Sequence, residues 1–182
     1  TAHELGHKKT FVERSLAKLV LAIGAYGHFF IEHNKGHHRD VATPEDPASS
    51  RMGETIYQFV LREIPGAARR AWQLEKSRLH AADKSHWSLA NEIIQPAIIS
   101  IVVYSVLIYL FGWVMLPFLA ILVFWGAFQL TSANYIEHYG LLRQRLENGK
   151  YERCQPHHSW NSNHSFSNWA VFHLQRHSDH HA

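Results

Sequence analysis

The sequence has almost no cysteine, because Cys154 is the only one among 182 residues. This excludes a disulfide framework and metal sites built from several cysteine thiolates. An excess of one charge is also missing, since 18 Lys and Arg are balanced by 15 Asp and Glu. The formal charge of +3 is too small and too dispersed to indicate nucleic-acid binding. Function must therefore rest on other residue types.

Charged residues are absent altogether from Ile93 to Thr131. This run is about twice the length that a helix needs to cross the hydrocarbon core of a bilayer. Gly112 and Trp113 lie near its midpoint, and Pro117 follows. The run predicts a transmembrane helical hairpin over residues 93–131, with Trp113 near the membrane interface. A pair of buried helices in a large soluble domain is the alternative, but such helices usually keep a polar face.

A hairpin returns the chain to the side of the membrane that it left, so the segments before and after it share one face. Lysines and arginines flank the run on both sides, and none lies in its turn. By the positive-inside rule the shared face is cytoplasmic. The flanking residues are Lys76, Arg78, Lys84, Arg143, Arg145 and Lys150.

Histidine, in contrast, is abundant, with 16 residues. It is the commonest protein ligand of transition metals. Eight of these histidines form three clusters, within the strings HELGHK, EHNKGHH and LQRHSDHHA. Helical residues three or four apart lie on one face, so each cluster can point its imidazoles at a common point. The clustered residues are His3, His7, His33, His37, His38, His177, His180 and His181.

The number of clustered histidines indicates two metal ions. A structural zinc needs four ligands and a catalytic zinc three, and eight imidazoles exceed both numbers. The first cluster does spell H-E-x-x-H, the pattern of zinc metalloproteases. An intramembrane zinc protease would need a third ligand, typically an aspartate on a later membrane helix, and residues 93–131 offer none. His138, just past the apolar run, is a further candidate ligand, although a lone histidine at a helix end is more often a cap.

The topology constrains the segment between the first two clusters. If residues 10–31 crossed the membrane once, these clusters would lie about 30 Å apart on opposite faces. We therefore expect a broken or partly inserted helical pair, with Gly24 and Gly27 as bends. Residues 40–92 are polar and contain prolines, and they predict a loop followed by amphipathic helices.

Four strings of the sequence, HELGHK, EHNKGHH, NYIEHYG and LQRHSDHHA, resemble the signature set of the integral-membrane alkane monooxygenases. These enzymes belong to the histidine-box superfamily, which also contains membrane fatty-acid desaturases and hydroxylases. The superfamily shares only the histidine spacing, whereas NYIEHYGL and LQRHSDHHA are typical of alkane hydroxylases. The resemblance extends over essentially the whole chain. It implies an all-α integral membrane helical bundle with its histidine-box helices on the cytoplasmic side.

The resemblance also implies an activity, which is the terminal hydroxylation of medium-chain n-alkanes with O2 and two electrons from rubredoxin and its reductase. It implies the bacterial inner membrane as the location, with the site toward the cytoplasm. Because the family has transmembrane helices before the first box, we expect residues 1–182 to be a single partial membrane hydroxylase domain of a longer protein. The implied ligands of two non-haem iron ions are His3, His7, His33, His37, His38, His138, His177, His180 and His181.

Other residues receive supporting roles. Glu32, Glu137 and Asp179 adjoin proposed ligands, and we expect each to orient the imidazole of a neighbouring ligand. The remaining histidines are interpreted as structural: His28, His80, His86, His157, His158, His164 and His173.

Basic residues after the hairpin form a candidate docking face for rubredoxin, which is small and acidic. Glu147 and Glu152 dilute its charge, and a plain solvated surface is the alternative. The face comprises Arg143, Arg145, Lys150, Arg153 and Arg176. A fatty-acid desaturase or hydroxylase, with the same metal chemistry on an acyl chain, remains open as an alternative function.

Overall fold

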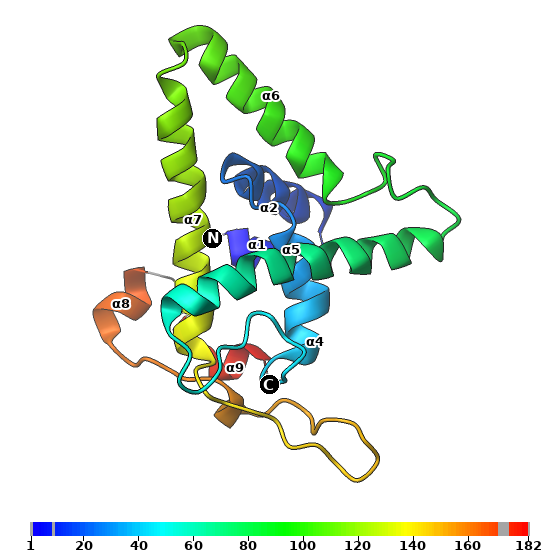
Figure 1. Cartoon of the computed structure of the whole chain (residues 1–182), viewed down its shortest axis with the longest axis vertical. Helices are drawn as coiled ribbons and strands as arrows, with labels where there is room; N and C mark the ends of the chain where they lie inside the picture. Colours follow the sequence, from blue (N-terminus) through cyan, green and yellow to red (C-terminus); the bar gives the residue numbers. More distant parts are fainter. Residues whose placement is uncertain (1, 9, 171–174, 182) are drawn as a thin grey trace. The chain divides into compact units, whose positions relative to one another are not determined.

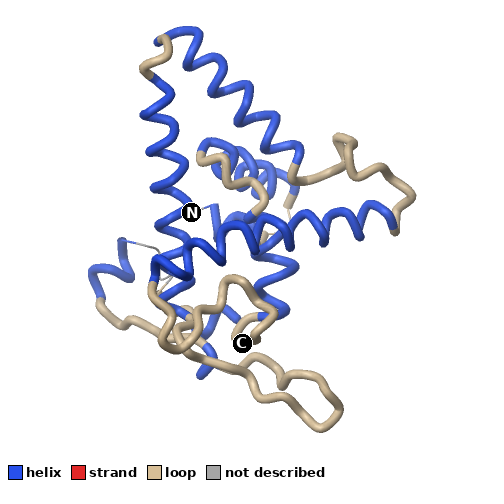
Figure 2. Tube along the Cα trace, in the orientation of Figure 1, coloured by secondary structure: helices blue, strands red, loops and turns tan. Residues whose placement is uncertain are grey.

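The computed structural model describes residues 2–8, 10–170 and 175–181, and they form helices joined by loops (Figures 1 and 2). No β-strand occurs in these ranges, where Arg145 and Tyr151 form an isolated antiparallel bridge. The predicted all-α fold class is therefore confirmed. The chain divides into two compact units. Unit one comprises residues 1–36 and 67–129, and unit two comprises residues 37–66 and 130–182.

The helices follow one another in the order that Figure 1 labels. Two short non-α turns interrupt them, a π-helical turn (η1) and a 3-10 turn (η2). The elements are α1 (Ala2–Gly6), α2 (Phe11–Ile23), α3 (Phe29–Ile31), η1 (Glu32–His37), α4 (His38–Asp40), α5 (Ile56–His80), α6 (Ile94–Phe111), α7 (Met115–Glu137), η2 (Pro156–His158), α8 (Ser165–Ala170) and α9 (Ser178–His181).

The charge-free run forms the predicted hairpin, in which α6 and α7 are joined by a turn at residues 112–114 (Figure 1). Both helices are long and apolar enough to cross a membrane. Only 11% of the apolar window of α6 and 17% of that of α7 are buried, whereas a core helix of a soluble domain is mostly buried. Ile101, Leu110 and Phe118 are among the exposed side chains. This exposed apolar surface is consistent with an all-α membrane bundle.

The segment before the second histidine cluster is broken, as predicted. Helix α2 begins at the N-cap Thr10, whose hydroxyl accepts a hydrogen bond from the backbone N–H of Glu13 at 3.3 Å. It ends at Gly24, and α3 begins only at Phe29. At 13 residues, α2 is too short to span the bilayer alone.

Helix α2 packs against α6 within unit one. Its buried face carries Ala17, Leu21 and Ala22. The Ser100 hydroxyl of α6 donates to the carbonyl of Ala22 at 2.6 Å, in addition to the backbone N–H of Ala25 at 3.0 Å, so it ties α6 to the end of α2. The Tyr104 hydroxyl donates in the same way to the carbonyl of Ile23, also at 2.6 Å.

Residues 40–92 differ from the prediction in one respect. After the predicted loop, a single 25-residue helix, α5, takes the place of several amphipathic helices and continues through Pro65. In unit two, Arg62 of α5 donates to the carbonyls of Pro47 and Ser49, both at 3.1 Å. These bonds hold the loop that precedes α5. This loop carries a buried carboxylate of the site described next.

Candidate metal centre

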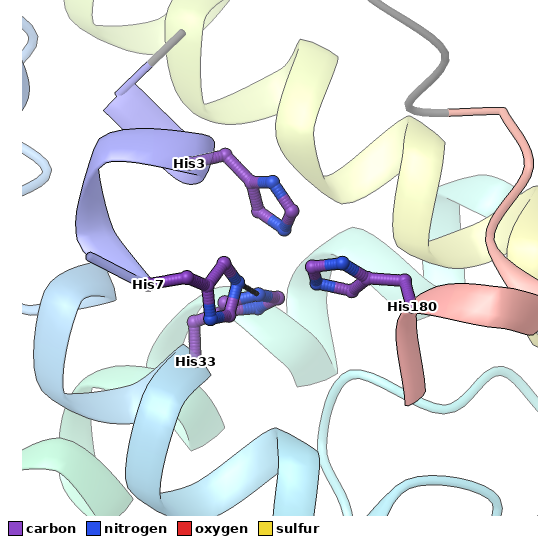
Figure 3. A group of neighbouring side chains, drawn as sticks. All are labelled: His3, His7, His33 and His180. Atoms are coloured by element: carbon purple, nitrogen blue, oxygen red, sulfur yellow. Dashed lines mark hydrogen bonds between the residues drawn. The ribbon is translucent and has the colours of Figure 1, made fainter. Parts of the chain in front are cut away.

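The first histidine group lies in unit one and joins α1 to η1 (Figure 3). His3 and His7 are four residues apart, and their ring centroids lie 5.0 Å apart. The ring of His33 lies 4.4 Å from that of His3, and the Nε2 atoms of His33 and His7 are 3.1 Å apart. Phe29, one helical turn before His33, stacks on its ring at 4.8 Å. The structure thus brings the two histidines of the first cluster, His3 and His7, together with His33, the first histidine of the second cluster.

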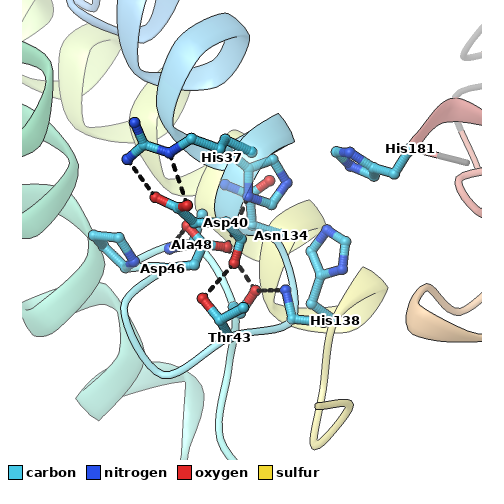
Figure 4. A network of polar contacts seen from close by, with 12 residues as sticks. His37, Asp40, Thr43, Asp46, Ala48, Asn134, His138 and His181 are labelled. Atoms are coloured by element: carbon cyan, nitrogen blue, oxygen red, sulfur yellow. Dashed lines mark hydrogen bonds and ion pairs between the residues drawn. The ribbon is translucent and has the colours of Figure 1, made fainter. Parts of the chain in front are cut away.

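The second group lies in unit two and consists of His37, His138, His177 and His181, which offer ligand atoms within 4.8 Å of one another. Figure 4 shows His37, His138 and His181 with their imidazoles turned toward one another. Four nitrogen donors at this spacing match the number of ligands that a tetrahedral metal ion requires. His138, the lone candidate of the sequence, is therefore a full member of this group.

A third group comprises His38, His180 and His181, also within unit two. The Nε2 atoms of His38 and His180 lie 3.2 Å apart. His181 belongs to both groups of this unit, and burial lowers its pKa below the usual value. An imidazole kept neutral in this way is the form that binds a metal.

The second and third boxes do not point all their histidines at one place. His33 joins the first box, His37 joins His138, and His38 joins His180. Adjacent residues on a helix point in different directions, so His37 and His38 serve different groups, whereas His180 and His181 share the third group. The turn between His33 and His37 is also π-helical, which changes the α-helical register on which the common-point expectation relied.

Asp46 forms a hydrogen bond with Nδ1 of His37. The Nδ1–H of His37 donates to Asp46 Oδ2 at 2.8 Å, and both side chains are 0% exposed. Asp46 also accepts from the Ser49 hydroxyl at 2.6 Å and from the backbone N–H of Ala48 at 3.1 Å. A carboxylate behind a histidine fixes its tautomer and ring orientation, and it directs Nε2 toward the metal. The sequence interpretation missed Asp46, whose only signal was a carboxylate in the loop that follows the second box.

His138 is oriented by a backbone group instead. Its Nδ1 lies 3.3 Å from the carbonyl oxygen of His158, which can only accept, so Nδ1 carries the proton. Its Nε2 is buried and has no hydrogen-bond partner among the described residues. Burial, with the neighbouring His37, lowers the pKa of His138 to about 3. A buried, neutral nitrogen that faces three other imidazoles fits a metal ion.

The predicted supporting carboxylates have different partners. Glu137 lies beside His138 in the sequence, but its carboxylate lies 3.4 Å from Nε2 of His177. Glu32 forms an ion pair with Arg70. The side chain of Asp179 lies outside the part of the chain that the structure describes.

Glu152, His157 and His158 form a further cluster that resembles a metal site. The backbone N–H of Gln155 donates to Nδ1 of His158 at 2.9 Å, so the proton of the neutral ring is on Nε2, which faces Glu152 at 3.4 Å. A protonated nitrogen cannot bind a metal. The cluster instead supports η2, whose His158 carbonyl orients His138.

The other histidines interpreted as structural join no metal-binding group within the described ranges. They are His28, His80, His86 and His164, and His173 lies outside these ranges.

The fold and these groups define a class: a helical membrane protein with buried histidine groups that can hold metal ions. The family described as fatty acid desaturase matches residues 1–182, and the chain belongs to this family.

Among characterised relatives, the chain is 67% identical to alkane 1-monooxygenase 1 of Alcanivorax borkumensis and 66% identical to alkane 1-monooxygenase of Ectopseudomonas oleovorans. Each match covers 100% of the chain and 45% of the relative. The hydroxylase component XylM of the xylene/toluene monooxygenase of Pseudomonas putida is 28% identical over 88% of the chain and 42% of the relative. The chain thus spans about half the length of these relatives.

Proposed function

We propose that the full-length protein hydroxylates the terminal carbon of medium-chain n-alkanes to give primary alcohols. The support is the identity of 67% and 66% to two alkane 1-monooxygenases over all of this chain, which includes every histidine cluster. The reaction would consume O2 and two electrons, delivered by rubredoxin and its reductase.

We infer that the cofactor is a pair of non-haem iron ions held by the nine histidines. The observation that carries this inference is the group of His37, His138, His177 and His181, whose ligand atoms lie within 4.8 Å of one another. Imidazole suits Fe(II). When bound, iron supplies the activation of O2 that cleavage of an unactivated C–H bond requires.

The residues of the chain would position this chemistry. Hydrocarbon partitions into the bilayer, so the substrate would approach along membrane-exposed surfaces such as those of α6 and α7. His138 directly follows α7, so a ligand would lie at the end of a spanning helix. We place this end at the cytoplasmic face of the bacterial inner membrane, because lysines and arginines flank the hairpin and are absent from its turn.

The electron donor would dock on the basic residues after the hairpin. Arg143 contributes least to such a face, because its guanidinium donates to the carbonyls of Arg39 at 2.7 Å and Glu152 at 3.2 Å. Arg153 and Arg176 are exposed and would carry more of the docking.

The experiment that tests the proposal compares two substrate classes. Membranes with the full-length protein and a reductant chain receive octane or an acyl substrate of similar length. We expect 1-octanol from the first and little product from the second. A product from the acyl substrate alone would support the alternative, a desaturase or hydroxylase of acyl chains, which the family match also favours. One zinc per chain and no iron would overturn the iron inference and support a zinc hydrolase.

A further inference from the structure

The π-helical turn η1 is fastened to α5 within unit one. Glu32, the first residue of the turn, is 2% exposed, and its carboxylate accepts a hydrogen bond from the guanidinium of Arg70. Arg70 is also largely buried, with 11% of its side chain exposed. These two residues lie 38 positions apart in the sequence, so the pair connects two separate elements.

The same guanidinium covers Gly36. A β carbon at this position would lie 2.7 Å from Nε of Arg70 and 3.0 Å from Cζ, which is closer than real β carbons approach other atoms. The planar group therefore lies against the backbone of the turn. A β carbon at this position would therefore have to displace the guanidinium from the turn.

The two contacts lie at chemically informative places. Glu32 directly precedes His33, and Gly36 directly precedes His37. Arg70 thus touches the turn at the residues directly before each of these histidines. π-Helical turns are rare and occur frequently at functional sites, because they change the register of the side chains that follow.

Stability alone does not explain this arrangement. Removing two charges from water costs several kcal/mol per ion in typical proteins, and an apolar pair of similar volume is often as stable. A planar, multidentate arginine does offer geometric specificity that an apolar side chain does not.

We propose that Arg70 is a positioning residue that keeps η1 in its π-helical register and so aims His33 and His37 at their metal groups. The proposal rests on the histidine metal centre proposed above, but not on the identity of the substrate. In this proposal Arg70 acts through the turn, at Glu32 and Gly36.

The test uses the full-length protein in detergent and four variants. Arg70→Met keeps an unbranched side chain but removes the charged guanidinium group. Arg70→Lys keeps the charge without the planar group, and Gly36→Ala fills the space beneath it. Arg69→Met is the matched control, since Arg69 is the exposed neighbour on the same helix. The measurements are metal affinity, the absorption spectrum of the cobalt-substituted protein, and the thermal midpoint of the metal-free protein.

We expect Arg70→Met and Gly36→Ala to weaken metal binding by about 10–100-fold and to change the cobalt spectrum, as loss of a supporting group around a metal site typically does. Arg70→Met should also lower the thermal midpoint of the metal-free protein, because it leaves the buried Glu32 carboxylate without this partner. Gly36→Ala should leave that midpoint near the parent's, so in this variant the loss of affinity is separate from any loss of fold. Arg70→Lys should recover part of the affinity, and Arg69→Met should match the parent in every measurement.

A double-mutant cycle covers the case in which a variant folds poorly. If the guanidinium is what excludes a β carbon, Gly36→Ala should have a much smaller effect on metal affinity in an Arg70→Ala background than alone. Additive effects would overturn the proposal. Parent-like affinity and spectrum in Arg70→Met would also overturn it, as would a loss of metal that only follows a loss of fold. If the parent itself binds no metal, the proposed function fails instead.

Discussion

At the scale of single residues, two histidines of the second group (His37, His138, His177 and His181) are held by hydrogen bonds at Nδ1. His37 Nδ1 donates to Asp46, and His138 Nδ1 donates to the carbonyl of His158. Both bonds settle which ring nitrogen carries the proton before any metal arrives. The two supports differ in charge, because a carboxylate raises the basicity of the histidine that it holds and a neutral carbonyl does so less.

The charge of Asp46 can be removed with little change in shape. In the full-length protein, Asp46→Asn should lower metal affinity by about 10–100-fold, since the amide cannot replace a carboxylate that accepts three hydrogen bonds. Glu45→Gln is the matched control, because Glu45 is exposed and adjacent. Affinities from competition with a chromophoric chelator measure the effect. Equal affinities for both variants would show that Asp46 is not needed to support His37.

For the cluster around His158 we predict no change in metal binding. His157→Ala and Glu152→Gln should leave the number of bound metal ions unchanged, because Nε2 of His158 carries a proton and cannot be a ligand. Metal analysis of the purified full-length variants measures this number. The loss of one ion per chain in either variant would make the cluster a metal site and refute the tautomer assignment.

At the scale of elements, the sequence predicts what local pattern determines. The absence of charge in residues 93–131 was enough to predict the hairpin, and the need to keep the first two clusters on one face of the membrane was enough to predict the break between them. The π-helical register of η1 was not predictable in this way. This turn is contacted by Arg70 of α5. The residue pattern within EHNKGHH cannot indicate a contact with a residue on another helix.

The candidate metal centre, too, was predictable from local sequence patterns only in part. The eight box histidines follow from spacing, because clusters of one residue type are visible in a linear sequence. Their assignment to groups does not, because His37 meets residues about 100 and 140 positions later. Asp46 was missed for a related reason, since its role depends on a loop that Arg62 holds in place.

The contact between Gly27, in the turn that follows α2, and Pro96 of α6 gives a prediction at this scale. A β carbon on Gly27 would lie 2.5 Å or less from the β and γ carbons of Pro96. Gly27→Ala should therefore destabilise the protein by about 1–3 kcal/mol through overpacking. At Gly24 the nearest atom would be 3.8 Å away, so Gly24→Ala is the control and should have a much smaller effect. Thermal unfolding of both full-length variants in detergent compares them, and equal midpoints would contradict this packing.

At the scale of the whole molecule, the histidine groups join segments that are distant in the chain. The second group consists of the last residue of η1, the residue after α7, the residue before α9 and one residue of α9, so none of the described elements contains more than one of its members. Metal binding should therefore contribute to the stability of the folded chain, because the unfolded chain has no preformed site.

This coupling predicts a metal-dependent stability. For the metal-free, full-length protein under anaerobic conditions, Fe(II) at about 100 times its dissociation constant should stabilise the fold by about 2.7 kcal/mol for a single site. His138→Ala should lose a large part of this gain, because His138 is 0% exposed and offers a buried ligand atom to the group. His80→Ala should keep it, since His80 is exposed at the end of α5. Thermal midpoints with and without Fe(II) measure the gain. If His138→Ala responded to Fe(II) as the parent does, His138 would not be a ligand, and the second group would reduce to the histidines of the boxes.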